Sequence, residues 1–336
     1  MATSLLNSSV LWVEIYSRHL ERVFLPHDIY SELDIVQCQQ LSTPREKIKH
    51  FTPLEDVNVI DANLIPKKSL SYVEISPKML KEFPKKAIIR LTHIYNTILR
   101  LEYIPEQWKR AKVIMLLKPG KPLEDVTSYR PISFLPGLSK LLEKCLLKRL
   151  KPIIEEKHLI PNYLFGCRNK HSTIDQVQRV TNVISEALEE KHYCCGVFLD
   201  LAQASDKVWH KGFFIKLCDQ LPHTWCALFE LYLTDRQFRV IHKEAITEWK
   251  DILAGVPQDS VLGSILYLLY TTDTPNDNNT TVAILTEDTA ILSTSKNHLT
   301  ATDNLQELID NVWTRRWKMP SMPRCHLPLY DTAYKS

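Results

Sequence analysis

Glycine is scarce in this 336-residue chain, which contains 7 glycines where average usage would give roughly three times as many. All seven lie between Gly120 and Gly263, so we expect the positions with demanding backbone geometry to fall within that stretch. The eight cysteines include no C-x-x-C pair and no Cys/His spacing typical of zinc sites. These absences exclude a zinc-stabilised module and are consistent with a reducing intracellular compartment.

Long apolar runs and targeting segments are also lacking. The longest apolar run, Val261–Tyr270, is too short to span a bilayer. Glu14 and Arg18 interrupt the apolar stretch near the N-terminus, so the sequence predicts no signal peptide. We therefore expect an intracellular protein without a membrane partner. No motif distinguishes nucleus from cytoplasm, and none indicates an oligomeric state.

Positive charge is concentrated in one segment, although the net charge of the whole chain is only +3. Residues 76–152 contain 17 Lys and Arg against 6 Asp and Glu. Such a block indicates a surface that faces a polyanion. The alternative is a set of solvated helix faces.

The spacing of apolar residues indicates a mixture of helices and strands without strict βαβ alternation, which favours the α+β class. We expect a strand over 111–117, and helices over 85–101, 138–150, 172–191 and 260–270, with a last helix that buries Leu305 and Leu308. Residues 1–75 are weakly patterned and broken by prolines, so they are interpreted as an N-terminal extension. Residues 319–336 have no period and are expected to form an irregular tail.

A β-hairpin is predicted over residues 281–295. Two apolar runs, 282–285 and 290–292, flank a four-residue turn that carries Glu287 and Asp288. Tight hairpin turns favour Gly-containing pairs, so an acidic pair is a poor choice for stability alone. Paired carboxylates are well suited to hold divalent ions near a phosphate. An exposed acidic turn without such a role is the alternative.

A third carboxylate follows a short buried strand, 196–199, which ends in Asp200. If this strand lay beside the hairpin, Asp200 would converge with Glu287 and Asp288. Three carboxylates from two segments are the set that nucleotide polymerases use to hold two metal ions.

Seven segments together resemble the reverse transcriptase of non-LTR retrotransposons, most closely the jockey type of insect elements. They occur in the family's order over about residues 85–317, and they read WKRAKVIMLLKPGKP, TSYRPISFLPGLSKLLEKCLLKRL, LFGCRNKHST, VFLDLAQASDKVWH, LTDRQFRV, AGVPQDSVLGSILYLLY and VAILTEDTAIL. The resemblance implies an RNA-directed DNA polymerase with right-hand architecture. Fingers would span 76–190 and the palm 191–318, with the thumb largely missing.

The resemblance also implies partners and site residues. RNA template, DNA primer and deoxynucleoside triphosphates would be bound. Two Mg²⁺ ions, replaceable by Mn²⁺, would be held by Asp200, Glu287 and Asp288. The nucleotide would be contacted by Lys118, Lys121, Arg130, Leu201, Ser205 and Gln258. In this set, Leu201 offers its backbone carbonyl, and the cations meet the triphosphate. Gly255 and Gly263 would permit close backbone approach, whereas Tyr129 would belong to the core.

The chain departs from the family at several of these positions. Glu287 replaces an aspartate and carries one more methylene, which moves the carboxylate by roughly 1 Å, enough to cost on the order of a hundredfold in rate. Ser205 replaces the phenylalanine that excludes a ribose 2′-hydroxyl. Asp259 replaces a glycine and would either cap the following helix or repel template phosphate. We therefore expect impaired polymerase activity. The alternatives are an inactive nucleic-acid-binding remnant of such an element, or a chain that does not fold stably.

Overall fold

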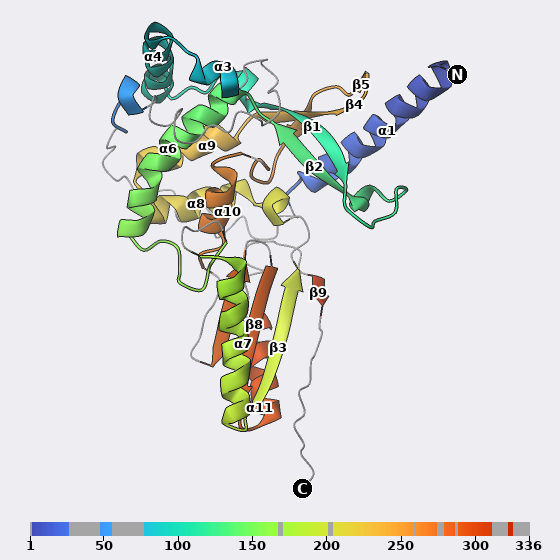
Figure 1. Ribbon diagram of the computed structural model, residues 1–336, viewed down its shortest axis with the longest axis vertical. Coiled ribbons are helices and arrows are strands. Elements are labelled where there is room, and N and C mark those ends of the chain that lie inside the picture. Colours follow the sequence, from blue (N-terminus) through green and yellow to red (C-terminus); the bar gives the residue numbers. More distant parts are fainter. Residues whose placement is uncertain are drawn as a thin grey trace. The chain divides into compact units, whose positions relative to one another are not determined.

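The computed structural model describes residues 2–26, 48–55, 77–166, 171–200, 204–258, 260–273, 279–285, 288–310 and 322–324. The chain divides into two compact units (Figure 1). Unit 1 comprises Met1–Glu156 and Ser205–Ser264, and unit 2 comprises Lys157–Ala204 and Ile265–Ser336. Both units contain helices and strands, which confirms the predicted mixture of the two.

Unit 1 is built around a five-stranded sheet in which segments far apart in sequence pair. Its order is β2-β1-β4-β5, and β6 also pairs with β4. The strands are β1 (Arg110–Leu117), β2 (Tyr129–Phe134), β4 (Arg236–His242), β5 (Ala245–Ile246) and β6 (Lys250–Ile252). The predicted strand 111–117 is therefore confirmed. β1 pairs with β2 antiparallel and with β4 parallel, with Lys112 opposite Arg239.

A 22-residue helix, α1 (Ala2–Val23), packs on one face of this sheet, and the sequence analysis did not predict it. Tyr16 and Leu20 lie in one buried cluster with Val113 and Phe238. Burying side chains of this size contributes about 1.5–3 kcal/mol each. The segment expected to be an extension thus supplies part of the core, although residues 27–47 and 56–76 lie outside the described part of the chain.

Further helices complete unit 1. They are α3 (Pro77–Lys81), α4 (Lys85–Leu101), α5 (Glu106–Lys109), α6 (Gly137–Glu156), α8 (His210–Gln220) and α9 (His223–Leu233), with short 3₁₀ helices η3 (Val126–Ser128) and η4 (Ala204–Lys207). α4 matches the predicted bounds and buries an apolar stripe that includes Leu91 and Tyr95. The Tyr95 hydroxyl donates a hydrogen bond of 2.9 Å to the Leu138 carbonyl oxygen, which ties α4 to α6.

Unit 2 contains a four-stranded antiparallel sheet with the order β7-β8-β3-β9. The strands are β3 (Tyr193–Asp200), β7 (Thr280–Leu285), β8 (Asp288–Ser295) and β9 (Met322–Arg324). Two helices, α7 (Thr173–Glu189) and α11 (His298–Asp310), pack on this sheet (Figure 1). α10 (Gly263–Tyr270) begins in unit 1 and continues into unit 2. Within the described residues, no helix combines the length and the apolar character needed to cross a membrane.

The predicted hairpin exists, but its turn is tighter than expected. β7 and β8 remain paired as far as Leu285 opposite Asp288, so only residues 286 and 287 connect the strands. The four-residue turn predicted from Thr286 to Thr289 is therefore wrong: Asp288 and Thr289 belong to β8. The ladder continues because the backbone of a polar residue pairs as well as that of an apolar one. Thr286 and Glu287 lie outside the described residues.

Candidate functional site

The two aspartates singled out from the sequence lie on neighbouring strands of unit 2. The β3–β8 ladder runs from Tyr193 opposite Ser295 to Asp200 opposite Asp288. The strand and the hairpin therefore bring Asp200 and Asp288 to paired positions at one end of the ladder.

Asp288 is solvent-exposed and borders an open groove of about 530 Å³. Apolar side chains of α7 and of the sheet line most of this groove, among them Val177, Phe198 and Ala290. Carboxylate oxygens are the ligands that Mg²⁺ prefers, and the exposed carboxylate of Asp288 is accessible to ions. The described residues contain no group of three or more His, Cys, Asp or Glu that could hold a metal ion. Glu287 and Leu201 lie outside them, as does the side chain of Asp200.

The β1–β2 hairpin of unit 1 carries the three cations expected to meet a triphosphate. Arg130 is exposed and pairs across the ladder with Leu116. Lys121 is also exposed and lies in the connecting loop. The Lys118 ammonium, in contrast, already donates a hydrogen bond of 3.0 Å to the Thr127 carbonyl oxygen. The hairpin thus presents Arg130 and Lys121 to solvent, while part of the donor capacity of Lys118 is used within the loop.

The sheet face of unit 1 opposite to α1 combines cations with apolar and aromatic side chains. Residues of β1 alternate between this face and the core, so Arg110, Lys112, Ile114 and Leu116 share it. Across the strands, this row continues with Arg239 of β4. The guanidinium groups of Arg239 and Arg110 lie 4.5 Å and 5.4 Å from the centroid of the Trp249 ring. Cations next to aromatic planes are typical of surfaces that bind single-stranded nucleic acid.

The loop that carries Gln258 is fastened to the segment that carries Ser205. The Val256 amide donates to the Ser205 carbonyl oxygen at 2.8 Å, and the Gln258 side-chain amide lies 2.7 Å from Oδ2 of Asp206. Asp206 is 1% exposed. Nε2 of Gln258 is the donor in this contact, so the amide nitrogen faces Asp206. The structure therefore links the loop that carries Gln258 to the segment that carries Ser205 through Val256 and Asp206.

Close packing around Gly255 confirms the predicted need for glycine. Gly255 has φ +91°, and an added Cβ atom would lie 2.6 Å from the backbone oxygen of Asp206. At Gly263, a Cβ atom would lie 2.4 Å from the Pro257 carbonyl oxygen. The His210 ring contacts the Gly255 carbonyl oxygen through Nε2 at 2.7 Å, and burial lowers the pKa of His210.

Tyr129 is half-buried and packs edge-on against Trp12 and Tyr16, as expected for a core residue.

Asp259 lies outside the described residues, so its predicted capping role stays a prediction. Near the start of α10, Oγ of Ser260 accepts a hydrogen bond from the Gly263 amide at 2.7 Å.

Sequence reasoning missed three buried polar residues that surround this loop: Asp206, His210 and Glu143. Glu143 could have been found, because a glutamate on the apolar stripe of a predicted helix must have a buried partner. Asp206 and His210 carry no comparable local signal, since their partners come from the distant loop 254–258.

Comparison with known proteins agrees with the resemblance found in the sequence. Residues 116–320 match the family "Reverse transcriptase (RNA-dependent DNA polymerase)". The chain is 36% identical over 323 residues to "Probable RNA-directed DNA polymerase from transposon BS" of Drosophila melanogaster. This alignment covers 92% of the chain and 36% of that protein.

The chain is 37% identical over 319 residues to "RNA-directed DNA polymerase from mobile element jockey" of Drosophila funebris. This alignment covers 91% of the chain and 35% of that protein. The chain spans about a third of the length of these curated relatives. The match to the family model covers more than half of the chain, and so the chain belongs to the reverse transcriptase (RNA-dependent DNA polymerase) family.

Proposed function

We propose that this chain is the polymerase region of an RNA-directed DNA polymerase of a non-LTR retrotransposon. The observation that supports this most strongly is the ladder that places Asp200 opposite Asp288, in a chain that matches the family over residues 116–320. In the right-hand architecture, fingers would span 76–190 and the palm 191–318. The reaction would be attack of a primer 3′-hydroxyl on the α-phosphate of a nucleotide paired with an RNA template.

Asp200, Glu287 and Asp288 would hold two Mg²⁺ ions, or Mn²⁺ in their place, with the backbone carbonyl of Leu201 as a further ligand. When bound, such ions supply acidification of a hydroxyl and stabilisation of developing phosphate charge. The exposed position of Asp288 beside an open groove suits this role, because ions and phosphates can reach it.

The residues of unit 1 would bind the substrates. Arg130 and Lys121 would contact the triphosphate of the incoming nucleotide, with Lys118 as a weaker third cation. Ser205 would face the sugar, and Gln258 would offer Oε1 as an acceptor because Asp206 fixes its amide nitrogen. The face with Arg110, Arg239 and Trp249 would bind the RNA template.

The test is primer extension on poly(rA)/oligo(dT) with Mg²⁺ and with Mn²⁺, comparing the purified chain with Asp200→Ala. We expect extension that Asp200→Ala abolishes while RNA affinity stays unchanged. Asp303→Ala is the matched control, because Asp303 is an exposed aspartate of α11 in the same unit. Extension that survives Asp200→Ala would contradict the assigned role.

A second candidate is a nucleic-acid-binding protein without synthesis. It is favoured by Glu287 and Ser205, which replace residues that the family's chemistry uses, together with the basic aromatic face of unit 1. A chain that melts cooperatively, binds RNA with steep salt dependence and extends no primer in either metal would establish it. In that case, Trp249→Ala should weaken RNA binding and Asp200→Ala should not.

A further inference from the structure

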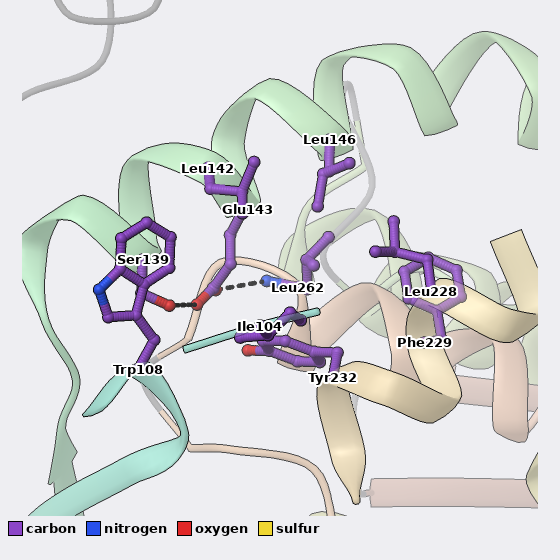
Figure 2. A pocket seen from close by; sticks show the side chains of 10 residues that line it. All are labelled: Ile104, Trp108, Ser139, Leu142, Glu143, Leu146, Leu228, Phe229, Tyr232 and Leu262. Atoms are coloured by element: carbon purple, nitrogen blue, oxygen red, sulfur yellow. Dashed lines mark hydrogen bonds between the residues drawn. The ribbon is translucent and has the colours of Figure 1, made fainter. Parts of the chain in front are cut away.

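Glu143 is a buried carboxylate that joins α6 to the segment before α10 (Figure 2). Its side chain is 1% exposed. Oε2 accepts hydrogen bonds from two consecutive backbone amides, those of Val261 at 2.7 Å and Leu262 at 3.3 Å. Oε1 lies 3.4 Å from the Ser139 hydroxyl, one helical turn away. The two backbone contacts span 118 and 119 positions of sequence, so nothing local enforces them.

The amides that Glu143 binds need a partner that the helix itself cannot provide. The first amides of an α-helix have no intrahelical acceptor. Ser260 satisfies the Gly263 amide from within the segment, whereas the two amides just before it depend on Glu143. A carboxylate at this end of a helix also interacts favourably with the helix dipole.

The surroundings of Glu143 leave few alternatives to these contacts. Figure 2 shows its carboxylate beside Leu262, in a group of side chains that includes Leu142 of α6, Tyr232 of α9 and Trp108 of α5. Burial raises the pKa of Glu143, while the two amides and the buried Arg236 guanidinium act in the opposite direction. The Leu262 contact is buried and the Val261 contact is part-buried. Loss of this acceptor would leave these amides poorly satisfied, because water has little room in a space lined mainly by apolar side chains.

The loop between Gly255 and Leu262 is therefore anchored at both ends by buried polar side chains of unit 1. At its start, His210 contacts the Gly255 carbonyl oxygen, and Asp206 binds the Gln258 amide. At its end, Glu143 binds the last two amides. Gln258 lies between the two anchors, so its position depends on both.

We propose that Glu143 is a positioning residue for nucleotide binding, which acts through the Val261 and Leu262 amides to hold the loop that carries Gln258. This inference rests on the proposed function, because Gln258 is assigned to the nucleotide there. Glu143 contacts no substrate in this role.

Three variants test the role of Glu143. Glu143→Met fills similar space but offers no comparable acceptor. Glu143→Gln keeps an oxygen that can accept both amides and removes the charge. Glu156→Gln is the matched control, because Glu156 is an exposed glutamate of the same helix. If Glu143→Met does not melt cooperatively, Glu143→Asp replaces it, since its carboxylate is one methylene shorter and reaches the amides poorly.

The first measurement is hydrogen exchange, which needs no catalytic activity. We expect the Val261 and Leu262 amides to be protected in the parent chain, in Glu143→Gln and in Glu156→Gln. In Glu143→Met, the protection of the amides in residues 255–262 should fall about tenfold or more, and the protection of the amides in β1 and β4 should stay unchanged. Rapid exchange of both amides in the parent chain would overturn the proposal. Loss of protection spread evenly over unit 1 would also overturn it, because Glu143 would then be merely structural.

The second measurement is steady-state primer extension with a varied nucleotide concentration. We expect Glu143→Met to raise KM for the nucleotide about tenfold or more with a smaller change in kcat, and Glu143→Gln to restore the parent value within about twofold. An unchanged KM in Glu143→Met would overturn the proposal. If the parent chain extends no primer, the proposed function fails, and the exchange measurement still decides whether Glu143 holds the loop.

Discussion

The backbone contact between Gly255 and Asp206 allows the cost of one added methyl group to be worked out. Gly255 has φ +91°, where an L-residue is strained by about 1–2 kcal/mol. In Gly255→Ala, the new Cβ atom would lie 2.6 Å from the backbone oxygen of Asp206 and 2.8 Å from its carbonyl carbon and its Cα atom. All three atoms are backbone, so the loop has to move, at a further cost of about 1–3 kcal/mol. We expect Gly255→Ala to lower the free energy of unfolding by about 2–5 kcal/mol.

Gly120→Ala separates the two contributions. Gly120 also has positive φ, +72°, but nothing lies within 4 Å of its added Cβ atom. It should therefore lose only the conformational part, about 1–2 kcal/mol. Alanine restricts the unfolded chain similarly at both sites, so this effect cancels in the comparison. The assay is urea denaturation of the two variants and the parent chain at one pH, with m-values compared to check two-state behaviour. Equal losses in the two variants would refute the close approach of Gly255 to Asp206.

Three further predictions concern the proposed chemistry and the pH dependence of stability. Asp288→Asn should lower metal-dependent primer extension at least about a hundredfold without changing the melting temperature by more than a few degrees, and retained extension would remove Asp288 from the metal site. Ser205→Phe should raise the preference for deoxynucleotides over ribonucleotides roughly tenfold or more in single-nucleotide addition, whereas an unchanged ratio would show that this position does not face the sugar. Burial lowers the pKa of His210, and the charge of Arg236 adds to that effect, so protonation favours the unfolded chain. The stability that neutral His210 contributes is present above about pH 6.5 and is lost as the pH falls through the lowered pKa. His210→Gln should therefore lose less stability than the parent chain between about pH 7 and pH 5 in thermal melts, and equal losses would show that another group titrates.

Local features of the fold could be predicted from the sequence because their partners are close in sequence. The predicted helix 172–191 begins with a local capping box: Ser172 accepts a hydrogen bond from the Asp175 amide, and the Asp175 carboxylate accepts one from the Ser172 amide. The buried face of α4 could also be predicted locally, because its residues Leu91 and Tyr95 lie about one helical turn apart in the sequence. α1 was missed although its buried residues, Tyr16 and Leu20, have the same spacing. We predicted an extension for the whole N-terminal segment because prolines follow α1.

Contacts between distant segments could not be predicted, because no local pattern specifies them. The parallel pairing of β1 with β4 joins residues more than 120 positions apart. Either strand would show the same alternation of buried and exposed side chains if it paired with another strand. The acceptor for the Val261 and Leu262 amides likewise comes from α6, and the sequence near α10 indicates only that some acceptor is needed.

The placement of the two aspartates shows how much the site depends on register rather than on the acidic turn. Asp200 pairs with Asp288 because β3 and β8 pair without a bulge from Tyr193 to Asp200. A slip of one residue would pair Asp200 with a different residue of β8. Asp288 is held by pairing with Leu285 on one side and with Asp200 on the other, whereas position 287 is part of neither described ladder. A substitution at position 287 therefore changes no residue of these ladders. It follows that weak activity caused by Glu287 should be restored by Glu287→Asp alone, whereas defects in the ladder should not respond to that change.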